Sequence, residues 1–274
     1  MRIIVFLSVV VLGGVVTLGC EDDPFDIQEE ELLVVRAFLY AGEPVEEVEL
    51  TLPIPIDSEA DPEPVSDATV SLVRDGDIYQ LEPTSGHPGF YSYTGTDLVV
   101  SPGDIFEMNV QWGTESVTAW TVVPEPPEGL ELSSDVMQIP EFGGGFGFGG
   151  GMFADPLVVH WDNPDGSYYF VVVDNIEEDP EALPTTELFV NRPIRFTSQP
   201  VASDSIFVNA MTLTHYGAHE LILYSVNEEY ADLYEGRTQD TRDLNEPPTN
   251  IDGGLGVFSA FAGRKALFVA VPEG

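Results

Sequence analysis

The sequence predicts an all-β protein, and three features support this class. Apolar residues recur at every second position over many short segments, which is the period of a half-buried strand. These segments are enriched in Val, Ile, Tyr, Phe and Thr, and turn-forming Gly, Pro, Asn and Asp separate them. Because the segments are short and closely spaced, they favour packed antiparallel sheets over a parallel sheet. We therefore expect two β-sandwich domains, immunoglobulin or transthyretin-like, with one short helix in the second.

The first predicted domain covers residues 21–124. Residues 45–52 (VEEVELTL) alternate apolar and acidic side chains, as a strand with one buried face does. Asp75-Gly76 separates two strand-like segments and is a strong hairpin signal, whereas residues 53–66 hold four prolines and are expected to form a loop. The expected strands of this domain are residues 32–40, 45–52, 68–74, 77–81, 89–94, 104–112 and 116–123.

The second predicted domain covers residues 125–274 and begins within a proline-rich connection, residues 124–127 (PEPP). Proline cannot continue a β-ladder and stiffens a linker, so we place the domain boundary after Pro124. The expected strands of this domain are residues 129–133, 156–162, 167–176, 205–214, 219–226, 255–261 and 266–271. The two segments that flank Gly217 are expected to form a hairpin.

The helix that we expect in the second domain covers residues 227–235 (NEEYADLYE). Asn227 is a suitable N-cap residue, acidic Glu228 suits the positive end of the helix dipole, and Gly236 can end the helix. Further along, residues 250–254 (NIDGG) are expected to form a turn before the last two strands.

A glycine-rich segment at residues 141–153 (EFGGGFGFGGGMF) interrupts the second domain. Glycine at this density offers few side chains to a core, and its ordering costs much entropy. One interpretation is a flexible loop inserted between strands. The other is an aromatic loop that becomes ordered on a partner or a membrane surface. In the second case the contact residues are Phe142, Phe146, Phe148 and Phe153.

Residues 1–20 have the layout of a bacterial lipoprotein signal peptide. Arg2 precedes an apolar run, and Gly19 precedes Cys20, the only cysteine of the chain. We predict that Cys20 carries lipid, which leaves the mature chain without a disulfide. A plain secretory signal and a membrane span are the alternatives, and Thr17 stands where lipoprotein signals usually have leucine.

The chain is strongly acidic, with 48 Asp and Glu residues against 9 Lys and Arg residues and a formal net charge of −39. Such a surface repels nucleic acid and anionic lipid headgroups, so we expect no nucleic-acid partner and regard anionic lipid as a poor candidate. Acid-rich, lysine-poor surfaces keep proteins soluble at high salt, where self-repulsion is screened, and we predict a halophilic protein. A functional acidic surface for cations or for a basic partner is the alternative.

Catalytic motifs are not evident, because the sequence contains neither GxSxG nor HExxH. His215 and His219 have the spacing of helical zinc ligands, but the turn-like residues between them favour two hairpin-end histidines. Residues 162–166 (DNPDG) favour a turn, with weak surface calcium binding left open. Among 48 acids, no carboxylate pair of a hydrolase can be singled out. We predict a protein without catalytic residues, metal site or cofactor.

Six aromatic residues lie in or beside expected strands of the first domain: Tyr79, Phe90, Tyr91, Tyr93, Trp112 and Trp120. Aromatic side chains at strand positions belong to the core more often than to the surface, so we expect most of them to be buried. An exposed subset would form a contact patch for a protein or a sugar.

Seven segments, taken in order, carry a family resemblance: LLVVRAFLYAGEPV, PVSDATVSLVRDGDIYQL, HPGFYSY, SPGDIFEMNV, VPEPP, LILYSVNEEYADLY and EPPTNIDGGLGVFSAFAG. Together they resemble an uncharacterised lipoprotein family of Bacteroidota-type bacteria, the domain of unknown function 4249. The most specific part is NIDGGLGVF, in which Asn250, Gly253, Gly254, Gly256 and Phe258 match the family's usual form. Gly253 and Gly254 permit a turn with positive φ, and Gly256 permits close approach of another backbone.

The resemblance implies an outer-membrane lipoprotein that accompanies a TonB-dependent receptor. Glu21-Asp22-Asp23 after Cys20 is similar to the surface-export tag of such bacteria, which implies a protein facing the cell exterior. Our first hypothesis is therefore a non-enzymatic accessory protein of such a receptor, active in ligand capture or complex assembly. A free-standing module that binds glycan or protein, or that serves in adhesion, is the second. A carboxylate-dependent hydrolase is the third.

Overall fold

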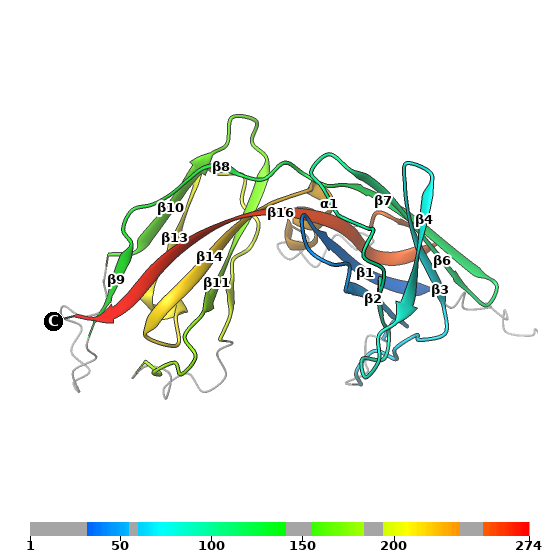
Figure 1. Ribbon diagram of the computed structural model, residues 1–274, viewed down its shortest axis with the longest axis horizontal. Coiled ribbons are helices and arrows are strands. Elements are labelled where there is room, and N and C mark those ends of the chain that lie inside the picture. Colours follow the sequence, from blue (N-terminus) through cyan, green and yellow to red (C-terminus); the bar gives the residue numbers. More distant parts are fainter. Residues whose placement is uncertain (1–31, 55–59, 141–154, 184–193, 236–248, 274) are drawn as a thin grey trace, which may run out of the picture. The chain divides into compact units, whose positions relative to one another are not determined.

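The computed structural model of the chain describes residues 32–54, 60–140, 155–183, 194–235 and 249–273 (Figure 1). Cys20 lies outside these ranges, as do Phe142, Phe146, Phe148 and Phe153, so the functions assigned to these five residues stay predictions. The described residues confirm the all-β class. They form one 13-stranded sheet, one three-stranded sheet and a single α-helix.

Strands β1 to β7 build the first core, and their bounds follow the expected segments within a few residues. They are β1 (Leu33–Tyr40), β2 (Glu47–Thr51), β3 (Thr69–Arg74), β4 (Asp77–Pro83), β5 (Phe90–Ser92), β6 (Ile105–Trp112) and β7 (Glu115–Val122). Strand β4 pairs with both β3 and β5, so consecutive strands surround one interior. The predicted turn between β3 and β4 is confirmed, because Asp75 has φ +54° and Gly76 has φ +91°.

The second core lies between the three-stranded sheet β13-β10-β8 and the strands β9, β11, β14 and β16. The elements after β7 are β8 (Glu128–Leu132), β9 (Val136–Ile139), β10 (Leu157–Asp162), β11 (Tyr168–Asn175), β12 (Phe196–Thr197), β13 (Ser205–Val208), the 3-10 helix η2 (Ala210–Thr212), β14 (Gly217–Val226), α1 (Glu228–Glu235), β15 (Ile251–Asp252) and β16 (Gly254–Pro272). The helix expected at residues 227–235 is thus confirmed.

Strand β16 joins the two cores (Figure 1). It pairs in parallel with β1 from Gly254 to Phe261, and antiparallel with β14 from Phe261 to Ala270. Phe258 and Ala260 lie in the first core, and Phe268 and Ala270 lie in the second. The domain boundary that we place after Pro124 stays a prediction.

Two expectations about strand pairing are wrong. The sequence predicts separate strands at residues 255–261 and 266–271, but β16 runs through both, because Gly263 packs beneath the ring of Tyr224 and makes no turn. The predicted hairpin around Gly217 is also absent from the described residues. Strand β13 pairs with β10, whereas β14 pairs with β11 and β16. Alternating burial identifies a strand and its buried face, but it does not identify the neighbouring strand.

Candidate functional site

Strands β4, β3, β6 and β7 present one side of their sheet to solvent. Their inward side chains, such as Leu72, Phe106 and Val117, fill the first core, so the residues between them point outward. We call this surface the open face. Its residues are Ile78, Gln80 and Glu82 on β4, Thr69, Ser71 and Val73 on β3, Ile105, Glu107, Asn109 and Gln111 on β6, and Ser116, Thr118, Trp120 and Val122 on β7.

The register arranges the open face in rows that cross the strands. Four cross-strand partners form the first row: Trp120, Glu107, Val73 and Ile78. The second row is Thr118, Asn109, Ser71 and Gln80, and the third is Ser116, Gln111 and Thr69. Large apolar side chains are thus concentrated at one end of the face, and uncharged hydrogen-bonding side chains fill the rest.

Trp120 is the most exposed of the six aromatic residues expected in the core, of which Tyr79 and Tyr91 are buried and Phe90, Tyr93 and Trp112 are half-buried. Its side chain is 67% exposed, whereas Trp112 packs against the edge of the first core. Ile105, on the neighbouring strand β6, is 60% exposed, and Ile78, at the opposite end of the first row on β4, is 70% exposed. Trp120 and Ile105 thus place two exposed apolar side chains on adjacent strands of the open face. The sequence contains a usable signal, since Trp120 follows the alternation of Ser116 and Thr118 rather than that of Val117 and Ala119.

The NIDGGLGVF segment supports the open face from the edge beside β7. The side-chain amide of Asn250 makes the two hydrogen bonds to Phe258 that the backbone of a neighbouring strand would make. Its Nδ2 donates to Phe258 O at 2.7 Å, and its Oδ1 accepts from Phe258 N at 2.9 Å. The same Nδ2 lies 3.4 Å from Trp120 O. Strand β15 then pairs with β7, with Ile251 opposite Ala119. The segment therefore extends the sheet that carries Trp120.

The glycines of this segment allow backbones to come close together. Gly253 has φ +78°, and a Cβ there would lie 2.5 Å from Ser116 O. Gly256 has φ +110°, and a Cβ there would overlap Val35 O on β1. The close approach predicted for Gly256 is thus confirmed, and so is the positive φ predicted for Gly253; the φ of Gly254 is not in the positive region.

A second outward surface carries aromatic residues beneath helix α1. We call it the covered face and define it by Phe38, Tyr40, Phe170, Tyr224 and Phe261, with Tyr230 of α1 packed over them. The ring of Tyr230 lies 4.9 Å from that of Phe261 and 5.6 Å from that of Phe38, edge to face in both cases. Burial is the main cause that raises the pKa of Tyr224 to about 12, and it also raises the pKa of Tyr40 and Tyr230.

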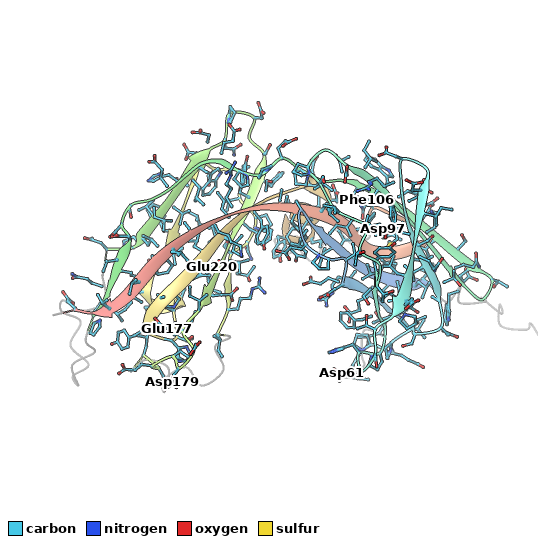
Figure 2. All side chains as sticks on the ribbon, viewed as in Figure 1. Asp61, Asp97, Phe106, Glu177, Asp179 and Glu220 are labelled. Carbon is cyan, nitrogen blue, oxygen red and sulfur yellow. The ribbon has the colours of Figure 1, made fainter. Side chains whose placement is uncertain are left out.

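Hydrogen bonds hold helix α1 against the end of β7. The side-chain amide of Asn227 donates to Val122 O at 2.7 Å, and Thr121 Oγ1 donates to Glu229 Oε1 at 3.0 Å. The contacts of Asn227 and Glu229 place α1 over the covered face and leave the open face without a covering element among the described residues. Elsewhere in the 13-stranded sheet, between β16 and β14, Lys265 Nζ lies 2.9 Å from Oε1 of Glu220, which is labelled in Figure 2.

The two histidines considered as metal ligands hold separate hydrogen bonds. His219 is buried and stacks on Phe268; its Nδ1 donates to Gly217 O at 2.9 Å, and Asn175 Nδ2 lies 3.3 Å from its Nε2. Burial is the main cause that lowers the pKa of His219. His215 Nδ1 lies 2.9 Å from Thr214 Oγ1. Across the described ranges, no group of three or more His, Cys, Asp and Glu residues can hold a metal ion.

The segment considered for calcium forms a turn. Asn163 Oδ1 accepts from Ser167 N at 2.9 Å, and Asn163 Nδ2 donates to Ser167 O and Ser203 O.

The hydrogen bond that Tyr93 donates to Asp97 lowers the pKa of the Asp97 carboxyl group. A general acid of a hydrolase needs the opposite shift. No helix within the described ranges is long and apolar enough to cross a membrane.

The fold is that of a β-sandwich protein, and Trp120 is exposed on its open face. The chain belongs to the family of the domain of unknown function DUF4249, whose model matches residues 22–266. No curated protein matches the chain. Domains A168-A170 from titin form a solved structure that is similar to this chain, with a TM-score of 0.22 and 11% identity over 88% of this chain and 67% of the titin chain.

Proposed function

We propose that this protein is a non-enzymatic lipoprotein, anchored through Cys20 in the outer membrane and facing the cell exterior. In this role it assists a TonB-dependent receptor, in ligand capture or in complex assembly. Membership of the DUF4249 family is consistent with the resemblance that implies this role. The lipoprotein-like residues 1–20 and the acidic residues 21–23 support the anchor and its outward orientation.

The open face is the observation that carries a binding role. Trp120 and Ile105 expose apolar side chains on adjacent strands of this face, and Ile78 exposes another at its opposite edge. Tryptophan is also enriched among the residues that dominate binding energy at interfaces. A free-standing binding or adhesion module is the second candidate function, and the same face favours it. A receptor gene next to the gene for this protein favours the accessory role, and its absence favours the free-standing module.

Adaptation to high salt is part of the proposal. The net charge of −39 generates self-repulsion that dissolved salt screens. We expect the thermal midpoint of the protein to fall when salt is reduced below about 0.1 M, where the screening length exceeds about 10 Å. A midpoint that is unchanged across this range, together with specific binding of a divalent cation, would instead indicate a functional acidic surface.

Co-purification from outer membrane tests the receptor association. The full-length protein, tagged at the C-terminus and expressed at native abundance, is extracted in mild detergent and captured. We expect a TonB-dependent receptor to be captured with it. Trp120→Ala should reduce that capture, whereas Phe207→Ala, which removes another exposed aromatic side chain, should not. A protein that is always recovered alone contradicts the accessory role.

A further inference from the structure

The open face carries little charge for so acidic a protein, since its acidic residues are Glu107 in the first row and Glu82 beyond Gln80 on β4. Its second and third rows hold seven side chains, all of them Ser, Thr, Asn or Gln: Thr118, Asn109, Ser71, Gln80, Ser116, Gln111 and Thr69. Outward positions on another strand are acidic, for example Glu47 and Glu49 on β2. In a chain with 48 acids, a contiguous uncharged block is a feature that solubility alone does not explain.

We infer that the open face binds a neutral polysaccharide chain. The inference rests on the proposed role in ligand capture and names the class of ligand. The net charge of −39 repels anionic polymers. A basic peptide would need several opposing carboxylates, and the open face offers Glu107 and, at its edge, Glu82. A ligand matched to this surface is therefore uncharged and rich in hydroxyl groups.

Trp120 supplies the apolar half of such a site. Its indole is 67% exposed at the edge of the uncharged rows. An indole ring presents a flat apolar surface with a negative face, against which the C–H groups of a sugar ring can stack. Thr118 and Asn109 follow directly in the next row, so hydroxyl groups of the same sugar have hydrogen-bond partners beside the ring.

The amide groups of the face are held in place by local hydrogen bonds. Gln111 Nε2 donates to Glu115 O at 2.7 Å, Gln80 Nε2 to Val70 O at 2.6 Å, and Asn109 Nδ2 to Glu107 Oε1 at 3.0 Å. In each case the amide nitrogen makes the bond, and the amide oxygen can accept a hydrogen bond from a sugar hydroxyl. Side chains that are already ordered lose little entropy on binding.

The dimensions of the face suit a chain rather than a single sugar. Four adjacent strands at about 4.8 Å spacing give a surface about 14 Å across, and the three rows extend about 13 Å along the strands. The rows lie on a sheet surface and not in a closed pocket, so a long polymer can cross them with both ends in solvent. A capture protein for polymer fragments needs this open geometry.

Affinity electrophoresis in native gels tests the inference. The soluble protein from residue 21 onward is run through gels that contain a mixed-linkage β-glucan, a xylan, a mannan or an α-glucan, with alginate as the anionic control. We expect retardation in at least one neutral gel and none in alginate. Trp120→Ala should weaken the binding about tenfold or more, and Phe207→Ala should leave it unchanged. Because neither partner group is charged, affinity should stay constant between about 0.5 M and about 2 M salt.

Each outcome decides the inference. Retardation that Trp120→Ala abolishes and Phe207→Ala preserves supports it. The inference is overturned by absence of retardation in all four neutral gels, by binding to alginate alone, or by binding that Trp120→Ala leaves intact. Receptor capture that depends on Trp120 without any glycan binding would assign the open face to a protein partner, and the proposed accessory role would survive. Glycan binding without receptor capture would support a neutral polysaccharide as the ligand and would contradict the accessory role to a receptor.

Discussion

Phe261 on the covered face and Trp120 on the open face occupy the same kind of position, an outward site on a central strand. Phe261 is nevertheless 1% exposed and Trp120 is 67% exposed. The difference comes from α1, which carries Tyr230 over Phe261 and its neighbours. An aromatic residue on the outer side of a sheet is thus structural where an element of the same chain covers it, and available for binding where none does.

Gly256→Ala should have the largest effect, because it disturbs the pairing of β1 with β16 in the sheet that carries both faces. A Cβ at Gly256 would overlap Val35 O and separate β1 from β16, so we expect a loss of about 3 kcal/mol or more in the free energy of unfolding. Urea unfolding measures this. Gly42→Ala is the matched control, since Gly42 also has positive φ but open space around it, and should cost about 1 kcal/mol. Equal losses in the two variants would contradict the close approach.

Phe261→Ala should lower the free energy of unfolding by about 3–5 kcal/mol, the range for a buried phenylalanine. The loss reflects the contacts of Phe261 with Phe38, Tyr40 and Tyr230. Phe207→Ala, at a site that is 59% exposed, should stay within about 0.5 kcal/mol of the parent protein. If the two variants were equally stable, α1 would not cover the face as described.

Alkaline pH should weaken the covered face selectively. The pKa of Tyr224 is about 12 in the folded protein against an ordinary value of 10.0. Between these values the unfolded chain loses the phenolic proton and the folded chain retains it, so the free energy of unfolding falls as pH rises from 10 towards 12. Tyr224→Phe cannot ionise and should lose less stability over that window in parallel urea titrations. Identical pH slopes for the two proteins would argue against the burial of Tyr224.

Trp120→Ala should have the smallest effect on folding, within about 0.5 kcal/mol, because its side chain is mostly exposed. It should also shift the tryptophan emission to shorter wavelength, since the remaining Trp161 is buried and Trp112 is partly buried. A loss above about 2 kcal/mol would mean that Trp120 packs against another part of the chain.

Local sequence signals predicted the strands well because they depend on neighbouring residues. The alternation in β2, the turn at Asp75-Gly76 and the helix from Glu228 are of this kind. Pairing depends on residues far apart in the chain, which explains the wrong hairpin around Gly217. The continuity of β16 between residues 261 and 266 was also missed, because Gly263 lies opposite Tyr224 of β14, far away in sequence.

The candidate site was only partly predictable for the same reason. Alternation assigns Trp120 to the outward side of β7, but the uncharged rows emerge only when β3, β4, β6 and β7 are aligned. The role of Asn250 was likewise beyond local signals. Its side chain bonds to the backbone of Phe258, eight residues later, and that arrangement exists only after β15 and β16 have turned back on each other.

The parallel pairing of β1 with β16 also has a kinetic consequence. Leu33 of β1 pairs with Gly254 of β16, and Phe258 of β16 completes the first core. Neither contact can form before these late residues of the chain are present. Contacts this distant in sequence make folding slow, because loop closure precedes the stabilising contact. The leading part of the chain therefore stays incomplete until the residues of β16 are available for pairing. Truncation before Gly254 should leave both cores open to proteases and to aggregation.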